Sequence, residues 1–315
     1  MERRKLGNTG LEIAPLVFGG NVFGWTIDEP TSFEILDAFT NAGFNCIDTA
    51  DVYSNWKPGN KGGESETVIG NWLKKRGNRE QVIIATKVGA DMGSGKNLKK
   101  QYILKAAEAS LKRLQTDYID LYQSHYDDPE TPLDETLEAY ETLIKAGKVR
   151  AIGASNFTAE RLEAALKTSE EKNLPRYQTL QPEYNLYARE GFEKALETVC
   201  LKNNLGVIPY FSLASGFLTG KYRSEADLGK SQRGGGIQKY LNERGFRILK
   251  ALDEVAAELN ATPAQVALSW LMHRPAVTAP IASATNRNQL NELIKAAELK
   301  LNKAAMEKLD LASVY

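Results

Sequence analysis

The chain has 315 residues, in which forty Lys and Arg residues balance forty Asp and Glu residues. Nucleic acids and anionic membranes need a concentrated basic surface, so this balance argues against both and favours a small-molecule partner. No stretch approaches the roughly 18 apolar residues of a membrane-spanning helix, and no apolar segment follows the basic start. We therefore expect a cytoplasmic protein.

Cysteine and histidine are scarce, with only Cys46, Cys200, His125 and His273 in the chain. Two cysteines in apolar segments, without metal-ligand spacing, are typical of free buried thiols. Two histidines exclude a multi-histidine metal centre, so we expect no bound metal.

Short apolar, β-branched runs recur along the chain, and segments with helical spacing separate them. The predicted strands are residues 14–20, 44–50, 81–88, 118–125, 149–155, 177–184, 206–211 and 277–282. Amphipathic helices are predicted at 32–43, 103–114, 133–147 and 159–172, among others. Thr31 and Thr158 are the expected N-caps of two of them, and Gly43 and Gly147 the expected left-handed stops.

This alternation implies parallel strands covered by helices. Eight units predict an α/β fold, a (β/α)8 TIM barrel formed by a single domain over residues 1–315. A doubly wound open sheet is the alternative, but no G-x-G-x-x-G turn follows a predicted strand. The alternation around Gly10 predicts an N-terminal β-hairpin over the barrel floor. The long glycine-rich loop after strand seven, residues 214–244, is expected to be a binding loop or lid.

Four ionisable residues of different types lie where such a barrel carries its working groups, at the C-terminal strand ends and the loops after them. Asp48, Lys87 and His125 end strands two, three and four, and Tyr53 follows strand two. A buried Lys87 needs a carboxylate such as Asp48. The positive charge of Lys87 would lower the pKa of Tyr53. Tyr53 would then be a general acid toward a carbonyl oxygen that His125 orients. Each residue alone has a structural alternative: turn capping for Asp48, a snorkelling side chain for Lys87, a buried packing role for His125.

The sequence offers little for other kinds of catalysis. No serine or cysteine nucleophile with a base, no paired carboxylates and no metal cluster is evident, so hydrolysis and metal catalysis lose support. An acid placed over a carbonyl still needs an electron source, and a reduced nicotinamide would supply hydride.

The chain resembles the aldo-keto reductases over essentially its whole length. The motifs that carry the resemblance are GFNCIDTADVY at 43–53, GGESETVIG at 62–70, IIATKV at 83–88, DLYQSH at 120–125, VRAIGASNF at 149–157, QPEYN at 181–185 and LASGFLTGKY at 213–222. The resemblance implies a metal-free barrel that binds NADP(H), less often NAD(H), and reduces aldehydes or ketones. The family's catalytic tetrad maps onto Asp48, Tyr53, Lys87 and His125.

The resemblance also implies a set of cofactor contacts. Ser155, Asn156 and Gln181 would bind the nicotinamide carboxamide, and Tyr210 would stack on the ring. The remaining expected contacts are Gly20, Asn21 and Asp48 at the first strands, with Phe211, Ser212, Leu213, Ser215, Gly216 and Lys221 in the pyrophosphate loop. The alternative for Ser155 and Asn156 is that they cap a helix. The alternative for residues 211–221 is a plain solvated loop.

The segment 283–293 matches the family's site for the adenosine 2'-phosphate. Many members carry a Lys and an Arg there, whereas this chain has Ser283 and Gln289, with Thr285 between them. The candidate replacement cations are Arg287 and, from the insert, Arg233, although either could equally be a surface arginine without a ligand. NADP(H) is still expected ahead of NAD(H).

We therefore expect an NADP(H)-dependent carbonyl reductase that is monomeric or weakly homo-oligomeric. Its substrate would lie between Trp25, Trp56, Tyr53 and His125, unless the tryptophans only pack at the barrel mouth. Two alternatives stay open. One is an NAD(H)-preferring sugar or polyol dehydrogenase of the same family. The other is a cofactor-binding regulatory subunit of a channel protein, with little turnover.

Overall fold

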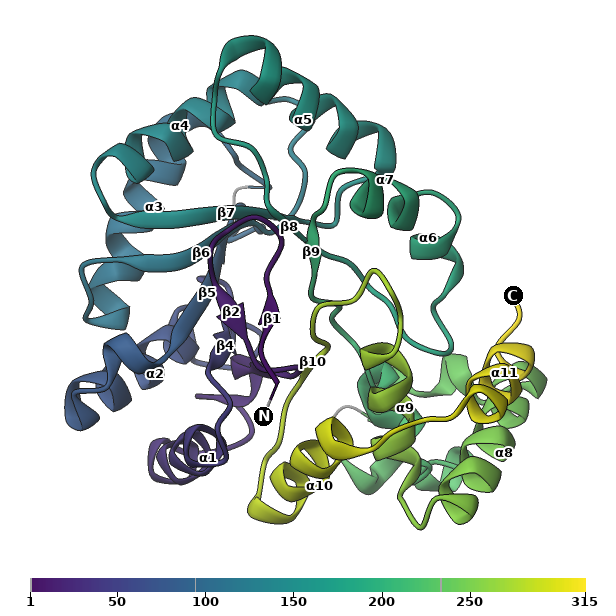
Figure 1. The fold of residues 1–315 in the computed structure, drawn as a ribbon. Helices are drawn as coiled ribbons and strands as arrows, with labels where there is room; N and C mark the ends of the chain where they lie inside the picture. Colours follow the sequence, from purple (N-terminus) through teal and green to yellow (C-terminus); the bar gives the residue numbers. More distant parts are fainter. Residues whose placement is uncertain (1, 94, 233) are drawn as a thin grey trace.

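The computed structural model describes residues 2–93, 95–232 and 234–315. Eight parallel strands pair in the order β10-β3-β4-β5-β6-β7-β8-β9, with helices around their outer face (Figure 1). They are β3 (Val17–Gly19), β4 (Cys46–Asp48), β5 (Ile83–Val88), β6 (Ile119–Ser124), β7 (Val149–Ser155), β8 (Thr179–Gln181), β9 (Gly206–Val207) and β10 (Ile281–Ala282). The predicted (β/α)8 fold is confirmed.

The seam between β9 and β10 is paired more sparsely than the rest. An isolated parallel bridge joins Val207 to Val277. The Thr278 N–H donates to the Val207 carbonyl at 2.8 Å, and the Ile281 N–H donates to the Pro209 carbonyl at 2.9 Å. Because proline has no N–H to donate, Pro209 and Pro280 shorten the ladder here, and the last two strands are shorter than predicted.

The helices are α1 (Glu29–Asn41), α2 (Glu64–Arg76), α3 (Lys100–Leu114), α4 (Leu133–Lys145), α5 (Ala159–Lys172), α6 (Glu190–Glu193), α7 (Leu196–Lys202), α8 (Glu243–Glu258), α9 (Pro263–Met272), α10 (Arg287–Glu298) and α11 (Lys303–Ala312). Thr158 caps α5 as predicted, accepting from the Arg161 N–H. The prediction that Thr31 caps α1 is wrong. The helix begins earlier and Asp28 is its cap, because Pro30 fits the first turn, where no N–H is needed.

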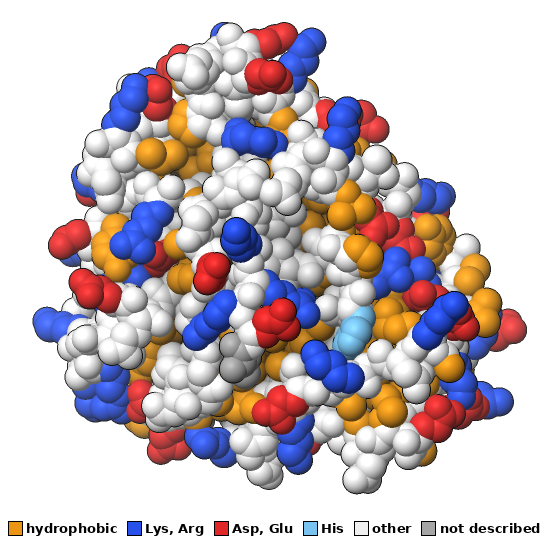
Figure 2. Space-filling model, in the orientation of Figure 1, with side chains coloured by type: hydrophobic (Ala, Val, Ile, Leu, Met, Phe, Trp, Pro, Cys, Tyr) orange, Lys and Arg blue, Asp and Glu red, His pale blue; other side chains and the backbone are white. Residues whose placement is uncertain are grey.

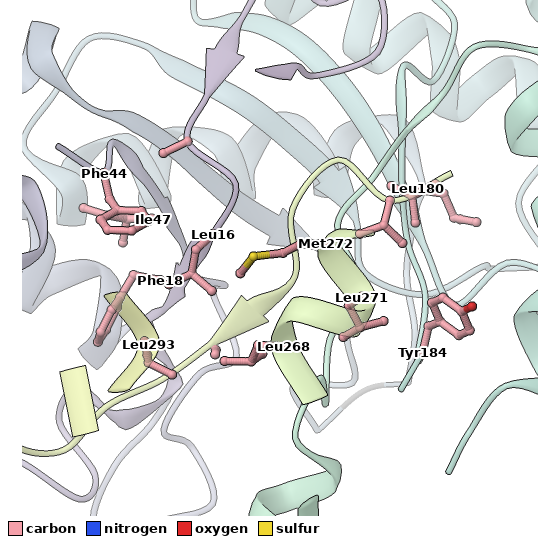
Figure 3. Close-up of a cluster of buried hydrophobic side chains, with 14 of the residues drawn as sticks. Leu16, Phe18, Phe44, Ile47, Leu180, Tyr184, Leu268, Leu271, Met272 and Leu293 are labelled. Carbon is pink, nitrogen blue, oxygen red and sulfur yellow. The ribbon is translucent and has the colours of Figure 1, made fainter. Parts of the chain in front are cut away.

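Strand alternation divides the apolar side chains into two cores. Figure 3 shows the outer one, where Phe18 and Ile47 from the sheet lie in the same cluster as Leu268 of α9 and Leu293 of α10. The inner core fills the barrel and contains Cys46. Because successive residues of a strand point to opposite faces, Cys46 and Asp48 both face inward, and Asp48 lies at the C-terminal end.

The N-terminal hairpin closes one end of the barrel. Strands β1 (Arg4–Lys5) and β2 (Glu12–Ile13) pair antiparallel, as predicted. Leu6 and Ile13 are fully buried and belong to the inner core together with Cys46 and Leu121. In Figure 1 the hairpin lies in front of the barrel strands. The opposite end is therefore the one left for a ligand.

The long insert after β9 is more ordered than its composition suggests. It contains the short 3-10 helices η3 (Ala214–Thr219), η4 (Glu225–Lys230), η5 (Gly234–Gly236) and η6 (Gln238–Tyr240). Two further 3-10 turns are η1 (Gly20–Val22) and η2 (Arg79–Gln81). Tyr240 is buried and stacks on Phe217, with ring centroids 5.2 Å apart. The insert thus packs on its own small aromatic cluster.

The surface carries charges of both signs. On the face shown in Figure 2, Lys and Arg side chains are interspersed with Asp and Glu, and neither sign of charge forms a continuous patch. No helix in the described ranges is long and apolar enough to cross a membrane.

Candidate active site

A cavity of about 1270 Å³ opens at the C-terminal ends of the strands. Most residues predicted to bind cofactor or substrate line it: Asn21, Asp48, Tyr53, Trp56, His125, Ser155, Asn156, Gln181, Tyr210, Phe211, Ser212, Leu213, Ser215, Gly216, Lys221, Ser283, Thr285 and Gln289. Residues from distant parts of the sequence therefore share one hollow, which is larger than a drug-sized ligand requires.

Lys87 lies beneath the cavity and connects two of its lining residues. Its ammonium donates to Asp48 Oδ2 at 2.7 Å, to the Thr49 carbonyl at 2.9 Å and to the Tyr53 hydroxyl at 2.8 Å. The Lys87 and Asp48 side chains are each only 1% exposed. Burial lowers the pKa of Lys87 from its ordinary value, and the Asp48 carboxylate opposes this shift. The arrangement places a buried cation against a phenol oxygen, where it stabilises a phenolate.

Asp48 is itself held in place by two amides. The Gln181 amide nitrogen donates to Asp48 Oδ1 at 2.9 Å, and that of Gln123 reaches the same oxygen at 3.4 Å. Sequence reasoning missed Gln123. The signal was present, because Gln123 precedes His125 by two residues on β6 and so points to the same side of the sheet.

His125 enters the cavity as a neutral imidazole. The residue is only 9% exposed, and burial, with Lys87 as the second cause, holds the pKa of its imidazole well below the ordinary value. Its Nδ1 has no hydrogen-bond partner among the described residues. Its ring stacks on Tyr126 at 4.9 Å and meets Tyr53 edge-on at 6.0 Å between centroids. A neutral imidazole has one N–H, which can donate to a ligand oxygen.

A chain of polar contacts extends from His125 along the next strand ends. The Asn156 amide donates to the His125 carbonyl at 2.8 Å, and the Tyr210 hydroxyl donates to Asn156 Oδ1 at 2.8 Å. The Ser155 hydroxyl donates to the Gln181 carbonyl at 2.8 Å. These contacts fix the Asn156 amide, the Ser155 hydroxyl and the Tyr210 ring on the cavity wall.

The loop after β9 has an unusual backbone. Phe211, Ala214, Ser215 and Gly216 all have positive φ, at 52°, 47°, 57° and 99°. Positive φ costs non-glycine residues roughly 1–3 kcal/mol each, and such strain clusters at ligand sites. Successive N–H groups in this geometry form a concavity suited to an anion. A side-chain carbon built on Gly216 would lie 3.6 Å from the Lys221 ammonium, so a cation borders the same loop.

The family model described as "Aldo/keto reductase family" matches residues 15–313. The chain belongs to this family.

Individual relatives agree with the assignment. The "Uncharacterized oxidoreductase YrpG" of Bacillus subtilis (strain 168) is 37% identical over 98% of this chain and 95% of its own length. The "Aldo-keto reductase YhdN" of the same organism is 33% identical, covering 96% and 90%. A "Probable voltage-gated potassium channel subunit beta" of Arabidopsis thaliana is 32% identical, covering 95% and 92%. The protein is thus an oxidoreductase with an aldo-keto reductase fold.

Members of this family generally use NAD(P)H without a metal. The cavity of this aldo-keto reductase fits such a cofactor, because fixed amides and an aromatic ring adjoin Asp48, Tyr53 and His125, and the left-handed loop beside Lys221 forms a concavity suited to an anion. Within the described part of the chain, no three His, Cys, Asp or Glu side chains are grouped to hold a metal.

The structure places some predicted residues elsewhere. Gly20 does not line the cavity, and its carbonyl accepts from the Ser65 hydroxyl at 2.8 Å. Trp25 lies behind the lining residue Trp56, edge-on at 5.5 Å. Arg287 borders a separate groove between α1 and α10. Arg233 lies outside the described residues.

Several lining residues carried no sequence prediction. They are Gly19, Thr26, Asn55, Lys96, Tyr126, Thr262 and Glu292, among others. Tyr126 adjoins His125 in sequence, which was an available signal. Glu292 lies within the predicted phosphate segment 283–293, but its own place at the cavity depends on how α10 packs, so no role was predicted for it.

Proposed function

We propose that this aldo-keto reductase reduces aldehydes and ketones with NADP(H), and that Tyr53 is the general acid. The observation that carries the proposal is the Tyr53 hydroxyl, 2.8 Å from the buried Lys87 ammonium and open to the same cavity as His125. A substrate carbonyl oxygen would thus meet Tyr53 as proton donor and His125 as a second hydrogen-bond donor. Lys87 would stabilise the conjugate base of Tyr53.

Each residue has a definite part in reduction. The His125 N–H and the Tyr53 hydroxyl would orient the carbonyl oxygen. A reduced nicotinamide, when bound, would supply the hydride that the carbonyl carbon needs. Tyr53 then gives its proton to the oxygen, and the ammonium of Lys87 stabilises the phenolate left behind. Asp48, paired with Lys87 at 2.7 Å, keeps that ammonium charged. In alcohol oxidation Tyr53 acts as the base.

Asn156 and Gln181 would hold the carboxamide of the cofactor and Tyr210 would lie against its ring. The anion site at residues 211–216, with Lys221 beside it, would take the pyrophosphate. Ser283, Thr285 and Gln289 also line the cavity and offer neutral donors, and we place the 2'-phosphate beside them.

The charge around the proposed 2'-phosphate site decides whether NADPH or NADH binds more tightly. Glu292 also lines the cavity, and its carboxylate accepts from Thr262 at 2.6 Å and from Gln265 at 2.9 Å, which offsets part of its charge. Parallel titrations with NADPH and NADH test the choice. Tighter binding of NADPH supports it, and tighter binding of NADH favours the dehydrogenase alternative.

The substrate is proposed to be a small carbonyl compound with an apolar body. Trp56, Tyr126 and Phe211 line the outer part of the cavity, and Trp25 supports Trp56. Such walls provide contact area with few polar anchors, so shape would select the substrate more than specific hydrogen bonds would.

The deciding experiment compares wild type with Tyr53→Phe, using NADPH and a panel of aldehydes. The variant should lose turnover by roughly 10²-fold to 10⁴-fold, the usual contribution of a general acid, and keep its NADPH affinity. Tyr118→Phe is the matched control, because Tyr118 lies between Arg79 and Arg150, away from the cavity, and should change neither quantity. Wild-type rates in Tyr53→Phe would refute the acid assignment. Tight NADPH binding without turnover in wild type would instead favour a regulatory subunit.

A further inference from the structure

Asp51 is a buried carboxyl that the mechanism above does not use. It follows β4 by three residues and is only 5% exposed. Its Oδ1 has no hydrogen-bond partner among the described residues. Its backbone N–H donates to the Lys87 carbonyl at 3.3 Å, so the residue is tied to the strand that carries the catalytic ammonium.

Arg113, the arginine beside Asp51, already forms an ion pair with Glu66. Glu66 on α2 is fully buried and accepts from the Thr86 hydroxyl and from Arg113 Nε, both at 2.6 Å. Asp51 forms no ion pair of its own within the described part of the chain, so it is the second acid beside one arginine. Burial, and after it the charge of Glu66, raises the pKa of Asp51 to about 7, against the pull of Arg113 and Lys87.

The titratable groups that interact electrostatically with Asp51 come from five elements. They are Glu66 of α2, Arg113 and Tyr102 of α3, Tyr140 of α4, Lys87 of β5 and Tyr122 of β6. Burial raises the pKa of all three tyrosines, so they stay neutral. Burial lowers the pKa of Lys87, whereas Asp48, and then Asp51, oppose this. Lys87 is therefore the catalytic group through which a charge on Asp51 acts.

We propose that Asp51 is a positioning residue whose carboxylate charge supports the Lys87 ammonium and thereby sets the pH range of proton transfer at Tyr53. The inference rests on the proposed function. The Lys87 ammonium donates to the Tyr53 hydroxyl at 2.8 Å, so a nearby negative charge that favours the ammonium keeps the protons of this hydrogen-bonded pair bound to higher pH. Below neutral pH Asp51 is protonated and has no such effect.

The test is the pH profile of aldehyde reduction in wild type and Asp51→Asn, which removes the charge and keeps the shape. The two rates should coincide at pH 6. Above neutrality the alkaline limb of Asp51→Asn should lie at lower pH by roughly half a unit or more, the scale of one charge at an effective dielectric near 20. Asp117→Asn is the control, because Asp117 is exposed and precedes β6, at the end of the barrel away from the cavity. Its profile should match wild type.

A second readout needs no turnover. A pH titration followed by phenolate absorbance is run on a protein and on the same protein with Tyr53→Phe, and the difference gives the midpoint pH for Tyr53 alone. Asp51→Asn should lower that midpoint pH. This separates failure of the inference from failure of the proposed function, since it can be read in an inactive protein. Superimposed midpoints in the two backgrounds, or equal shifts in Asp51→Asn and Asp117→Asn, would overturn the proposal.

Discussion

Replacing Lys87 with methionine tests whether the buried ion pair serves both stability and catalysis. Lys87→Met keeps the apolar stem and removes the ammonium, with its bonds to Asp48, Thr49 and Tyr53 at 2.7, 2.9 and 2.8 Å. Removing one partner of a buried pair costs about 3–5 kcal/mol, because the other charge stays buried. Asp48 keeps its amide bond from Gln181, so we expect roughly 3 kcal/mol, near the lower end.

A surface pair in the same barrel provides the control. Arg76 and Asp37 are 39% and 31% exposed, so Arg76→Met should cost at most about 1 kcal/mol. Urea denaturation at pH 7 gives both free energies of unfolding. Carbonyl reduction should fall by roughly 10²-fold or more in Lys87→Met and stay unchanged in Arg76→Met. A Lys87→Met protein that is as stable as Arg76→Met, or as active as wild type, would show that the buried pair does not serve both stability and catalysis.

Three further outcomes follow from the buried groups. Because the pKa of His125 is depressed in the folded state, its contribution to stability is present above about pH 6.5 and is lost as pH falls; denaturation at pH 5 and 7.5 should show a smaller loss in His125→Asn than in wild type. The pKa of Asp51 is raised to about 7, so its contribution is present below its unfolded value near 4 and is lost as pH rises through about 7. Asp51→Asn should therefore gain stability over wild type between pH 5 and 8.5, and equal pH slopes would contradict this. Gly153→Ala would place a carbon 2.1 Å from Thr179 Oγ1 and should lower the thermal midpoint markedly, whereas Gly191→Ala, with nothing within 4 Å, should leave it unchanged.

The sequence predicts most of the architecture because its local signals agree. Strand and helix periods alternate along the whole chain, and the ends of strands two, three and four hold Asp48, Lys87 and His125. The weak seam at β9 and β10 was harder to predict, because Pro209 and Pro280 remove donors from runs that otherwise have strand composition.

Side chains positioned by helix packing were beyond the sequence. Arg287 lies within the predicted phosphate segment, yet it begins α10 and borders the groove between α1 and α10. Glu66 and Arg113 are separated by 47 positions, and only the packing of α2 on α3 brings them together beside Asp51. Period and composition identify which face of a helix is buried, but not which polar groups meet across two helices.

A single-turnover experiment with the purified protein, NADPH and an aldehyde tests the proposed carbonyl reduction most directly. Bound NADPH should be oxidised in step with alcohol formation, one for one, and Tyr53→Phe should bind NADPH equally well but barely oxidise it. Failure of the wild-type protein to bind either NADPH or NADH, or equal single-turnover rates in the two proteins, would contradict the proposed function.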